Sequence, residues 1–162
     1  MIGMPNSKLL TIAVPAYNAA SYLHTCLDSL VRSGDEVEVL VVNDGSKDGT
    51  LQVAHDYAER YPGIVVAVDQ ENRNWGGAVN HALELASGTF FYIVDSDDWL
   101  DSAKLTEVVS RLRMLEEQQA GVDLYMVNYV YNRVENGDRY TISYEKLLPS
   151  DKVVGWDAMS NP

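Results

Sequence analysis

Short apolar runs rich in β-branched residues alternate with stretches of helical periodicity through most of the chain. The runs have the length of buried strands, and in the longer stretches apolar residues recur every three or four positions, as on one helical face. The expected strands are residues 9–14, 37–42, 64–68 and 89–94, and the expected helices are residues 21–32, 50–61 and 76–86, with a fourth marked by Leu105, Val108, Val109, Leu112 and Leu115. Apolar strands that alternate with helices form right-handed crossovers and a parallel sheet covered on both faces. The sequence therefore predicts an α/β fold with a mainly parallel sheet flanked by helices.

The pattern changes after the fourth expected helix. Residues 122–131 and 139–144 flank the segment Glu135-Asn136-Gly137-Asp138, and Asn-Gly is the strongest short signal for a β-hairpin. We expect a hairpin near the C-terminal end that makes the sheet mixed. The last amphipathic stretch begins at Val153 and reaches Pro162 before it completes an element, so we expect a single, truncated domain.

The charge of the chain restricts what it binds. Its 24 acidic residues against 12 Lys and Arg give a net charge of -12, which repels nucleic acid and anionic membrane surfaces. A diphosphate bound near such a surface needs local donors or a divalent cation. No segment approaches the roughly 20 apolar residues that span a bilayer. The single cysteine, Cys26, cannot form an internal disulfide, and we expect a buried thiol in a cytoplasmic protein.

Polar segments follow three of the four expected strands. They are Pro15-Ala16-Tyr17-Asn18 after the first, Asn43-Asp44-Gly45-Ser46 after the second and Asp95-Ser96-Asp97-Asp98 after the fourth. Ligands of open parallel sheets bind beyond the carboxyl ends of the strands, so these segments are expected to share one edge. The first segment lacks the Gly-x-Gly-x-x-Gly pattern, which disfavours dinucleotide binding of the dehydrogenase type.

The acidic segment after the fourth strand has several interpretations. Asp98, Asp101 or Ser102 could cap the following helix, but a cap leaves Asp95 and Asp97 unexplained, because two neighbouring carboxylates repel unless a cation or strong donors lie between them. An EF-hand is rejected because its spacing would put Trp99 at the fifth position, Leu100 at the sixth and Thr106 at the twelfth. An aspartyl nucleophile of the phosphatase type would follow a first strand. A divalent cation that also binds a diphosphate fits the charge, position and spacing together.

Asp44 has two interpretations at the end of the second strand. Its segment could be a turn whose side chains bond their own backbone. Its carboxylate could instead accept the imide N–H of a uracil, with Tyr17 as an aromatic face for the base. His81, inside a helix, is expected to be structural.

Together these residues resemble the family-two glycosyltransferases, which are inverting enzymes with a Rossmann-like GT-A fold. The resemblance runs from about Leu9 to about Leu112, and it is carried by residues 11–18, 39–50, 80–83 and 92–99 in that order. It implies that the nucleotide is bound by Pro15, Tyr17, Asn18, Asp44, Asn80 and Asp95. It also implies an Asp-x-Asp motif at Asp95 and Asp97 for ribose, diphosphate and metal, with Asp97 as the first metal ligand, Asp95 as the second, and Mn²⁺ or Mg²⁺ as the cofactor.

The chain departs from the family pattern at two points. The family often has an arginine before the residue that matches Asn80, whereas Val79 stands here and Arg73 lies earlier. The family's general base comes from a later segment than any matched here, so we expect no catalytic base before Pro162 and no activity from this chain alone. The resemblance implies a nucleotide-binding half at residues 1–101 and the start of an acceptor-side half at residues 102–162.

The resemblance also implies a function for the full-length protein. It is the transfer of a sugar, expected from a UDP-sugar, to a hydroxyl acceptor on a polysaccharide, lipid or protein, at the inner face of the membrane through parts of the protein not present here. A nucleotidyltransferase is one alternative, although its first strand is usually followed by a glycine-rich loop. A non-catalytic binding module is the other, and apolar surface left by the truncation would favour self-association.

Overall fold

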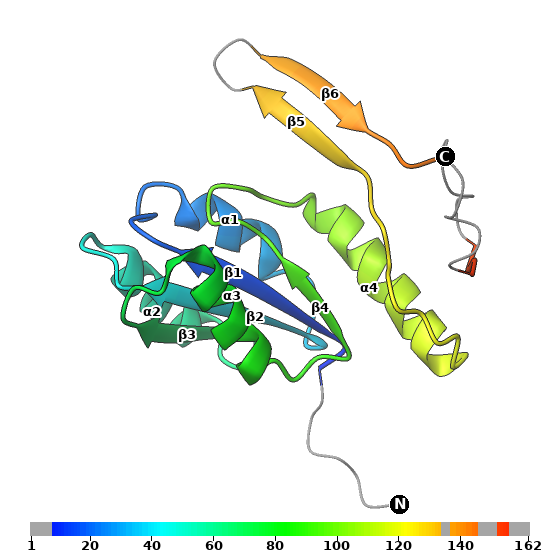
Figure 1. Ribbon diagram of the computed structural model, residues 1–162, viewed down its shortest axis with the longest axis horizontal. Helices are drawn as coiled ribbons and strands as arrows, with labels where there is room; N and C mark the ends of the chain where they lie inside the picture. Colours follow the sequence, from blue (N-terminus) through cyan, green and yellow to red (C-terminus); the bar gives the residue numbers. More distant parts are fainter. Residues whose placement is uncertain (1–7, 134–136, 146–151, 156–162) are drawn as a thin grey trace, which may run out of the picture. The chain divides into compact units, whose positions relative to one another are not determined.

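The computed structural model of the chain describes residues 8–133, 137–145 and 152–155 (Figure 1). Strands and helices alternate from the N-terminal side as the periodicity predicts. They are β1 (Leu10–Ala16), α1 (Leu23–Leu30), β2 (Val37–Asp44), α2 (Thr50–Arg60), β3 (Val65–Gln70), α3 (Asn74–Leu85), β4 (Phe90–Ile93), α4 (Ser102–Glu117), β5 (Tyr129–Arg133) and β6 (Asp138–Ile142). The predicted α/β architecture is confirmed.

The first four strands form one parallel sheet in the order β3-β2-β1-β4. The central strands β1 and β2 are buried along their whole length, which explains why their sequences are continuously apolar with no polar alternation. Because neighbouring strands run in the same direction, their carboxyl ends meet at one edge. The order places β1 and β2 in the middle of that edge, with β4 and β3 on either side.

Helices cover both faces of this sheet. On one face α3 contacts β1 and β2, and its buried Ala78 and Ala82 pack against Ala13, Leu40 and Val42. Small side chains let the helix axis approach the sheet closely. Side chains alternate between the two faces of a strand, so Val39 and Val41, which alternate with Leu40 and Val42, point to the other face. On that face α2 contacts β2 and β3. Figure 1 shows α3 in front of the sheet and α2 behind it.

Pro15 explains where β1 separates from β4. On the β4 side the carbonyls of Leu9 and Ala13 accept the N–H groups of Phe90 and Val94, so the N–H of residue 15 would be the next donor. Proline has none, and the pairing stops at Ala13↔Ile93. Beyond this point the chain is released from the sheet, and the acidic segment begins at Asp95.

A buried polar network closes the amino-terminal end of the sheet. The Thr11 hydroxyl donates to Glu38 Oε1 at 2.6 Å and accepts the N–H of Gly88 at 2.9 Å, while the N–H of Ser87 donates to the same carboxylate oxygen at 2.6 Å. A Cβ on Gly88 would lie 2.5 Å from the Thr11 nitrogen, so this position requires glycine. The network ties the α3–β4 connection to β1 and β2 at the end of the sheet opposite the polar segments.

The C-terminal hairpin is confirmed, with differences from the prediction. β5 and β6 pair antiparallel, but β5 begins at Tyr129 and not at residue 122. In the described residues the two strands form a sheet of their own, and the four-stranded sheet stays wholly parallel. Its loop residues Glu135 and Asn136, like Trp156 and Met159 of the last predicted stretch, lie outside the described residues, and Val153 itself is not helical.

The chain divides into two compact units, one that ends at Met114 and one that begins at Leu115. The boundary falls inside α4, beyond the division between residues 101 and 102 that the sequence suggests. The assignment of a donor-side and an acceptor-side role to the two parts stays a prediction. No helix in the described part of the chain is long and apolar enough to cross a membrane.

Candidate functional site

The three polar segments lie at the carboxyl edge of the parallel sheet, as predicted. The register pairs Ala16 with Asn43 across β1 and β2, and Ala13 with Ile93 across β1 and β4, so the three segments leave the sheet next to one another. A fourth segment, between β3 and α3, joins them, because β3 pairs with β2 up to Asp44↔Gln70. The prediction did not include this fourth segment.

Asn18 holds the first two segments together. Its backbone has a positive φ of 51°, a conformation that asparagine tolerates better than most residues. Its side-chain Oδ1 accepts the N–H of Lys47 at 2.8 Å, and its own N–H donates to Ser46 Oγ at 3.0 Å. The Asn18 amide oxygen therefore supports the loop after β2, and a contact of this residue with a nucleotide stays a prediction.

Asp48 and Thr50 fasten the same two loops from the α2 side. The Asp48 carboxylate accepts hydrogen bonds from the Thr50 hydroxyl, from the N–H of Thr50 and from the N–H of Ala20, and the Ala19 N–H donates to the Thr50 hydroxyl at 2.8 Å. These bonds, led by that from the Thr50 hydroxyl, lower the pKa of Asp48. An ionised Asp48 is thus part of the framework that carries Asn18 and Asp44.

Asp44 is buried, with 2% of its surface exposed, and it is the centre of a hydrogen-bonded group. Its Oδ1 accepts the side-chain N–H of Gln70 and the backbone N–H of Arg73, both at 2.7 Å, and its carbonyl accepts the Asn72 side chain at 3.0 Å. A simple turn residue would bond its own segment. Asp44 instead bonds the segment after β3, which gives its carboxylate a fixed orientation.

Asp95 is oriented by an exposed tryptophan. Trp75, in the first turn of α3, donates its indole N–H to Asp95 Oδ1 at 2.7 Å, although 54% of the Trp75 surface is exposed. The start of α3 therefore reaches two carboxylates of the site, Asp44 through the N–H of Arg73 and Asp95 through Trp75. Sequence reasoning missed Trp75 and Gln70. The rule about strand ends would have found Gln70, which closes β3, whereas nothing in the sequence pairs Trp75 with Asp95.

The acidic segment concentrates negative charge above the buried Cys26. Burial, with Asp98, Asp97 and Asp95 as additional causes, raises the pKa of the Cys26 thiol to about 12. Burial also raises the pKa of Asp98, with Asp97 and Asp95 as additional causes. Asp97 and Asp95 are therefore close enough to Asp98 to disfavour its ionisation, and a bound cation would relieve this repulsion.

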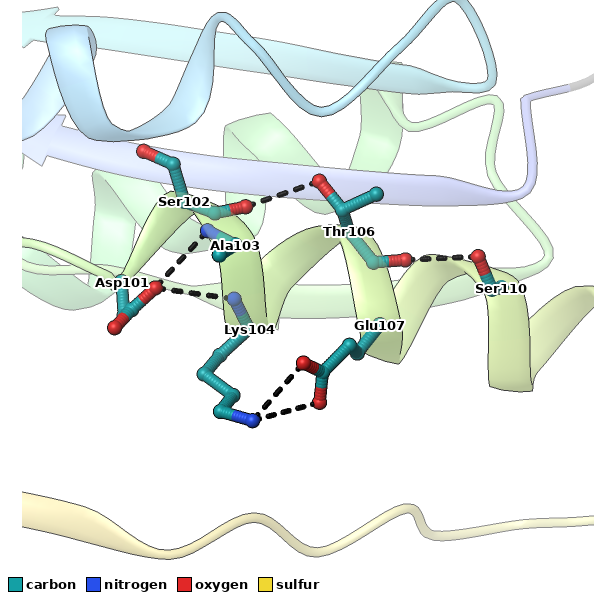
Figure 2. Close-up of polar contacts among 7 residues, drawn as sticks. All are labelled: Asp101, Ser102, Ala103, Lys104, Thr106, Glu107 and Ser110. Carbon is teal, nitrogen blue, oxygen red and sulfur yellow. Dashed lines mark hydrogen bonds and ion pairs between the residues drawn. The ribbon is translucent and has the colours of Figure 1, made fainter.

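Asp101 accounts for the helix-capping part of the acidic segment. Its Oδ1 accepts the N–H of Ala103 at 2.9 Å and the N–H of Lys104 at 3.1 Å, as Figure 2 shows. This is the arrangement of an N-cap. Asp95, Asp97 and Asp98 have no part in this cap, so the cap does not explain their charge.

The donor set fits a metal shared with a ligand better than a metal held by protein alone. Across the described residues, no group of three or more His, Cys, Asp or Glu side chains could hold a metal ion. Asp97 is exposed, and in the same part of the chain its carboxylate has no hydrogen bond or ion pair. Hard cations such as Mg²⁺ often take one or two carboxylates and fill their other positions with phosphate oxygens and water. Asp97 and Asp95 fit that kind of site.

The remaining predicted residues lie at different depths. Tyr17 is 53% exposed at the edge, so its ring is accessible to a planar ligand. Pro15 is buried within β1, and Asn80 is exposed on α3. The structure therefore brings Tyr17, Asn18, Asp44 and Asp95 to one edge, whereas Pro15 contributes chiefly by ending the β4 ladder.

Comparison with known proteins identifies the class to which this fold and site belong. The model of the family described as glycosyl transferase family 2 matches residues 11–158, and the chain belongs to that family. This membership decides against the nucleotidyltransferase alternative.

Individual relatives support the assignment. An uncharacterized glycosyltransferase, MG025 of Mycoplasma genitalium, is 38% identical over 101 residues, which cover 59% of this chain and 34% of the relative. The structure of Staphylococcus aureus TarS residues 1–349 in complex with UDP-GlcNAc is 30% identical, with a TM-score of 0.59 over 67% of this chain and 32% of TarS. A Pyrobaculum calidifontis mannosyltransferase in complex with GDP-Man and Mn²⁺ is 31% identical, with a TM-score of 0.55 over 62% and 31%. The chain spans about a third of the length of the first curated relatives.

Proposed function

We propose that this chain forms the donor-binding part of an inverting glycosyltransferase that uses a UDP-sugar and a divalent cation. The observation that carries the proposal is that carboxylates from the ends of two different strands lie at one edge of the sheet. Asp44 is the last residue of β2, and Asp95 and Asp97 lie after β4, with β1 between the two strands. Such an edge can hold a base at one end and a diphosphate at the other. The nucleotide sugars in the TarS and mannosyltransferase complexes support this class of ligand.

Each residue has a role that follows from its chemistry. The Asp44 carboxylate accepts a hydrogen bond from the base, and the exposed ring of Tyr17 stacks on its face. Asp97, with Asp95, holds the cation, which when bound neutralises charge that develops on the leaving diphosphate. The Trp75 indole orients Asp95 through the bond to Oδ1. Pro15, Asn18 and Asn80 complete the predicted nucleotide site from the neighbouring segments.

The acceptor side of the reaction is part of the proposal for the full-length protein. Inverting transfer needs a base that takes the proton from the acceptor hydroxyl. We place that base in a later segment than the nucleotide site, as the family resemblance implies, so this chain binds the donor without completing transfer. A cytoplasmic location likewise stays a prediction.

Thermal unfolding with ligands tests the proposal. With Mn²⁺ present, UDP at about 100 times its dissociation constant should stabilise the folded chain by roughly 2.7 kcal/mol. Asp97→Asn should lose the part of this stabilisation that depends on metal, because the substitution removes a carboxylate charge with little change of shape.

Asp101→Asn is the matched control. It removes one charge from the same region, and asparagine is also a good N-cap, so α4 and the response to UDP should be preserved. A wild-type chain that gains no stability from UDP with Mn²⁺ would contradict the proposal and favour a non-catalytic module. An equal loss in both variants would show that Asp97 is not a specific ligand.

A further inference from the structure

Gln70 links the buried Asp44 to His81. Its side-chain Nε2 lies 2.7 Å from Asp44 Oδ1, and its Oε1 lies 2.7 Å from His81 Nδ1. The register that pairs Asp44 with Gln70 places the two side chains next to each other, and α3 brings His81 over the same face of the sheet. Three elements thus converge on one amide side chain.

The chemistry of these groups fixes the direction of every hydrogen bond. Asp44 Oδ1 accepts the backbone N–H of Arg73 and is therefore an acceptor, so Gln70 turns its NH₂ toward it. Its carbonyl oxygen then faces His81, which must donate from Nδ1. His81 therefore holds Gln70 in the one orientation that suits Asp44, and it does so as the tautomer with the proton on Nδ1.

These bonds also limit what Asp44 can accept from a ligand. Its Oδ1 receives two N–H groups, from Gln70 and from the Arg73 backbone, which is as many hydrogen bonds as its two lone pairs accept. Within the described residues, Oδ2 has no such donor. A base that meets this carboxylate therefore finds one free acceptor oxygen in place of two.

The number of free acceptors distinguishes the bases. Guanine presents two adjacent donors, the ring N–H and the amino group, which match both oxygens of a carboxylate. Uracil presents a single imide N–H between two carbonyl acceptors. Cytosine and adenine place a ring acceptor beside their amino groups, which a carboxylate repels. We infer that Gln70, held by His81, makes the site selective for uracil over guanine by occupying Oδ1 of Asp44. This inference rests on the proposed nucleotide-binding function.

The test is the dissociation constant for GDP divided by that for UDP, which we call the ratio. Both constants are measured by calorimetry with Mn²⁺ on the whole chain. The wild type should bind UDP more tightly than GDP. Gln70→Leu removes one donor from Oδ1, so a second acceptor becomes available to guanine and the ratio should fall by about tenfold. Gln52→Leu is the control, because it makes the same change on the exposed face of α2 and should leave the ratio unchanged.

His81 provides a second pair of variants. His81→Leu removes the donor that holds the Gln70 carbonyl, and the ratio should fall as in Gln70→Leu. His81→Asn keeps an N–H near the position of Nδ1 and should restore the wild-type ratio. A purely structural defect lowers the fraction of competent protein for both nucleotides alike, which changes the calorimetric stoichiometry and leaves the ratio constant.

The outcomes separate the inference from the proposed function. A wild-type chain that binds neither nucleotide overturns both. Equal or tighter binding of GDP by the wild type overturns the inference alone, as does a ratio that Gln70→Leu leaves unchanged. A ratio that falls in His81→Asn as far as in His81→Leu removes His81 from the mechanism.

Discussion

Replacing Thr11 by valine tests the buried network at the end of the sheet opposite the candidate site. Thr11 is fully buried, and valine has nearly its shape without the hydroxyl. The variant loses a hydrogen bond to a carboxylate, worth about 1.5–3 kcal/mol, and leaves the Gly88 N–H without its partner, at about 1–3 kcal/mol. The Ser87 N–H still bonds Glu38, which reduces the loss. We expect the free energy of unfolding to fall by about 2–4 kcal/mol.

Urea unfolding followed by circular dichroism measures this change. With a slope near 2 kcal/mol per molar, typical of a small domain, the midpoint should fall by about 1–2 M. Thr106→Val is the control, because the exposed Thr106 hydroxyl donates only to the Ser102 carbonyl within α4 (Figure 2). Its effect should stay within about 0.5 kcal/mol. A Thr11→Val midpoint equal to that of the control would show that the Thr11 hydrogen bonds do not stabilise the chain.

Three further predictions concern the loops and the buried thiol. Gly45→Ala should destabilise the chain more than Gly34→Ala. Both glycines have positive φ, but of these two only Gly45 lies where an added Cβ would meet backbone, 2.8 Å from the Asn72 nitrogen. Equal urea midpoints for the two variants would contradict this. Cys26 should resist a thiol reagent at about pH 8 until urea unfolds the chain, because it is fully buried and its pKa is raised to about 12. Rapid labelling of the folded chain would contradict this. The pKa of Asp48 is lowered on folding, so its contribution to the free energy of unfolding is present above the unfolded pKa and is lost as the pH falls through the folded pKa. The stability advantage of the wild type over Asp48→Asn should therefore shrink in acid, and an advantage that grows in acid would contradict this.

The sequence predicts the sheet edge well because that edge depends on local patterns. Apolar runs locate β1, β2 and β4, and the rule about strand ends then brings Asp44 and Asp95 together. The sequence also places an N-cap among Asp98, Asp101 and Ser102, and the structure selects Asp101.

The polar contacts within the site depend on the strand order and cannot be found the same way. Gln70 bonds Asp44 only because β3 pairs with β2 in one register, and a shift of one residue would turn Gln70 to the other face. Trp75 reaches Asp95 because α3 begins two residues before the predicted start, at Asn74, which has an unusual positive φ of 63°. Such contacts follow from the assembled sheet and not from any periodicity.

A crystal structure of the chain with UDP and Mn²⁺ would show the proposed donor site itself. We expect a uracil ring beside Tyr17 with its imide N–H on Asp44 Oδ2, and a manganese anomalous peak next to Asp97 on the diphosphate side. Nucleotide bound away from the carboxyl edge of the sheet, or a manganese peak that avoids both Asp95 and Asp97, would contradict the proposal.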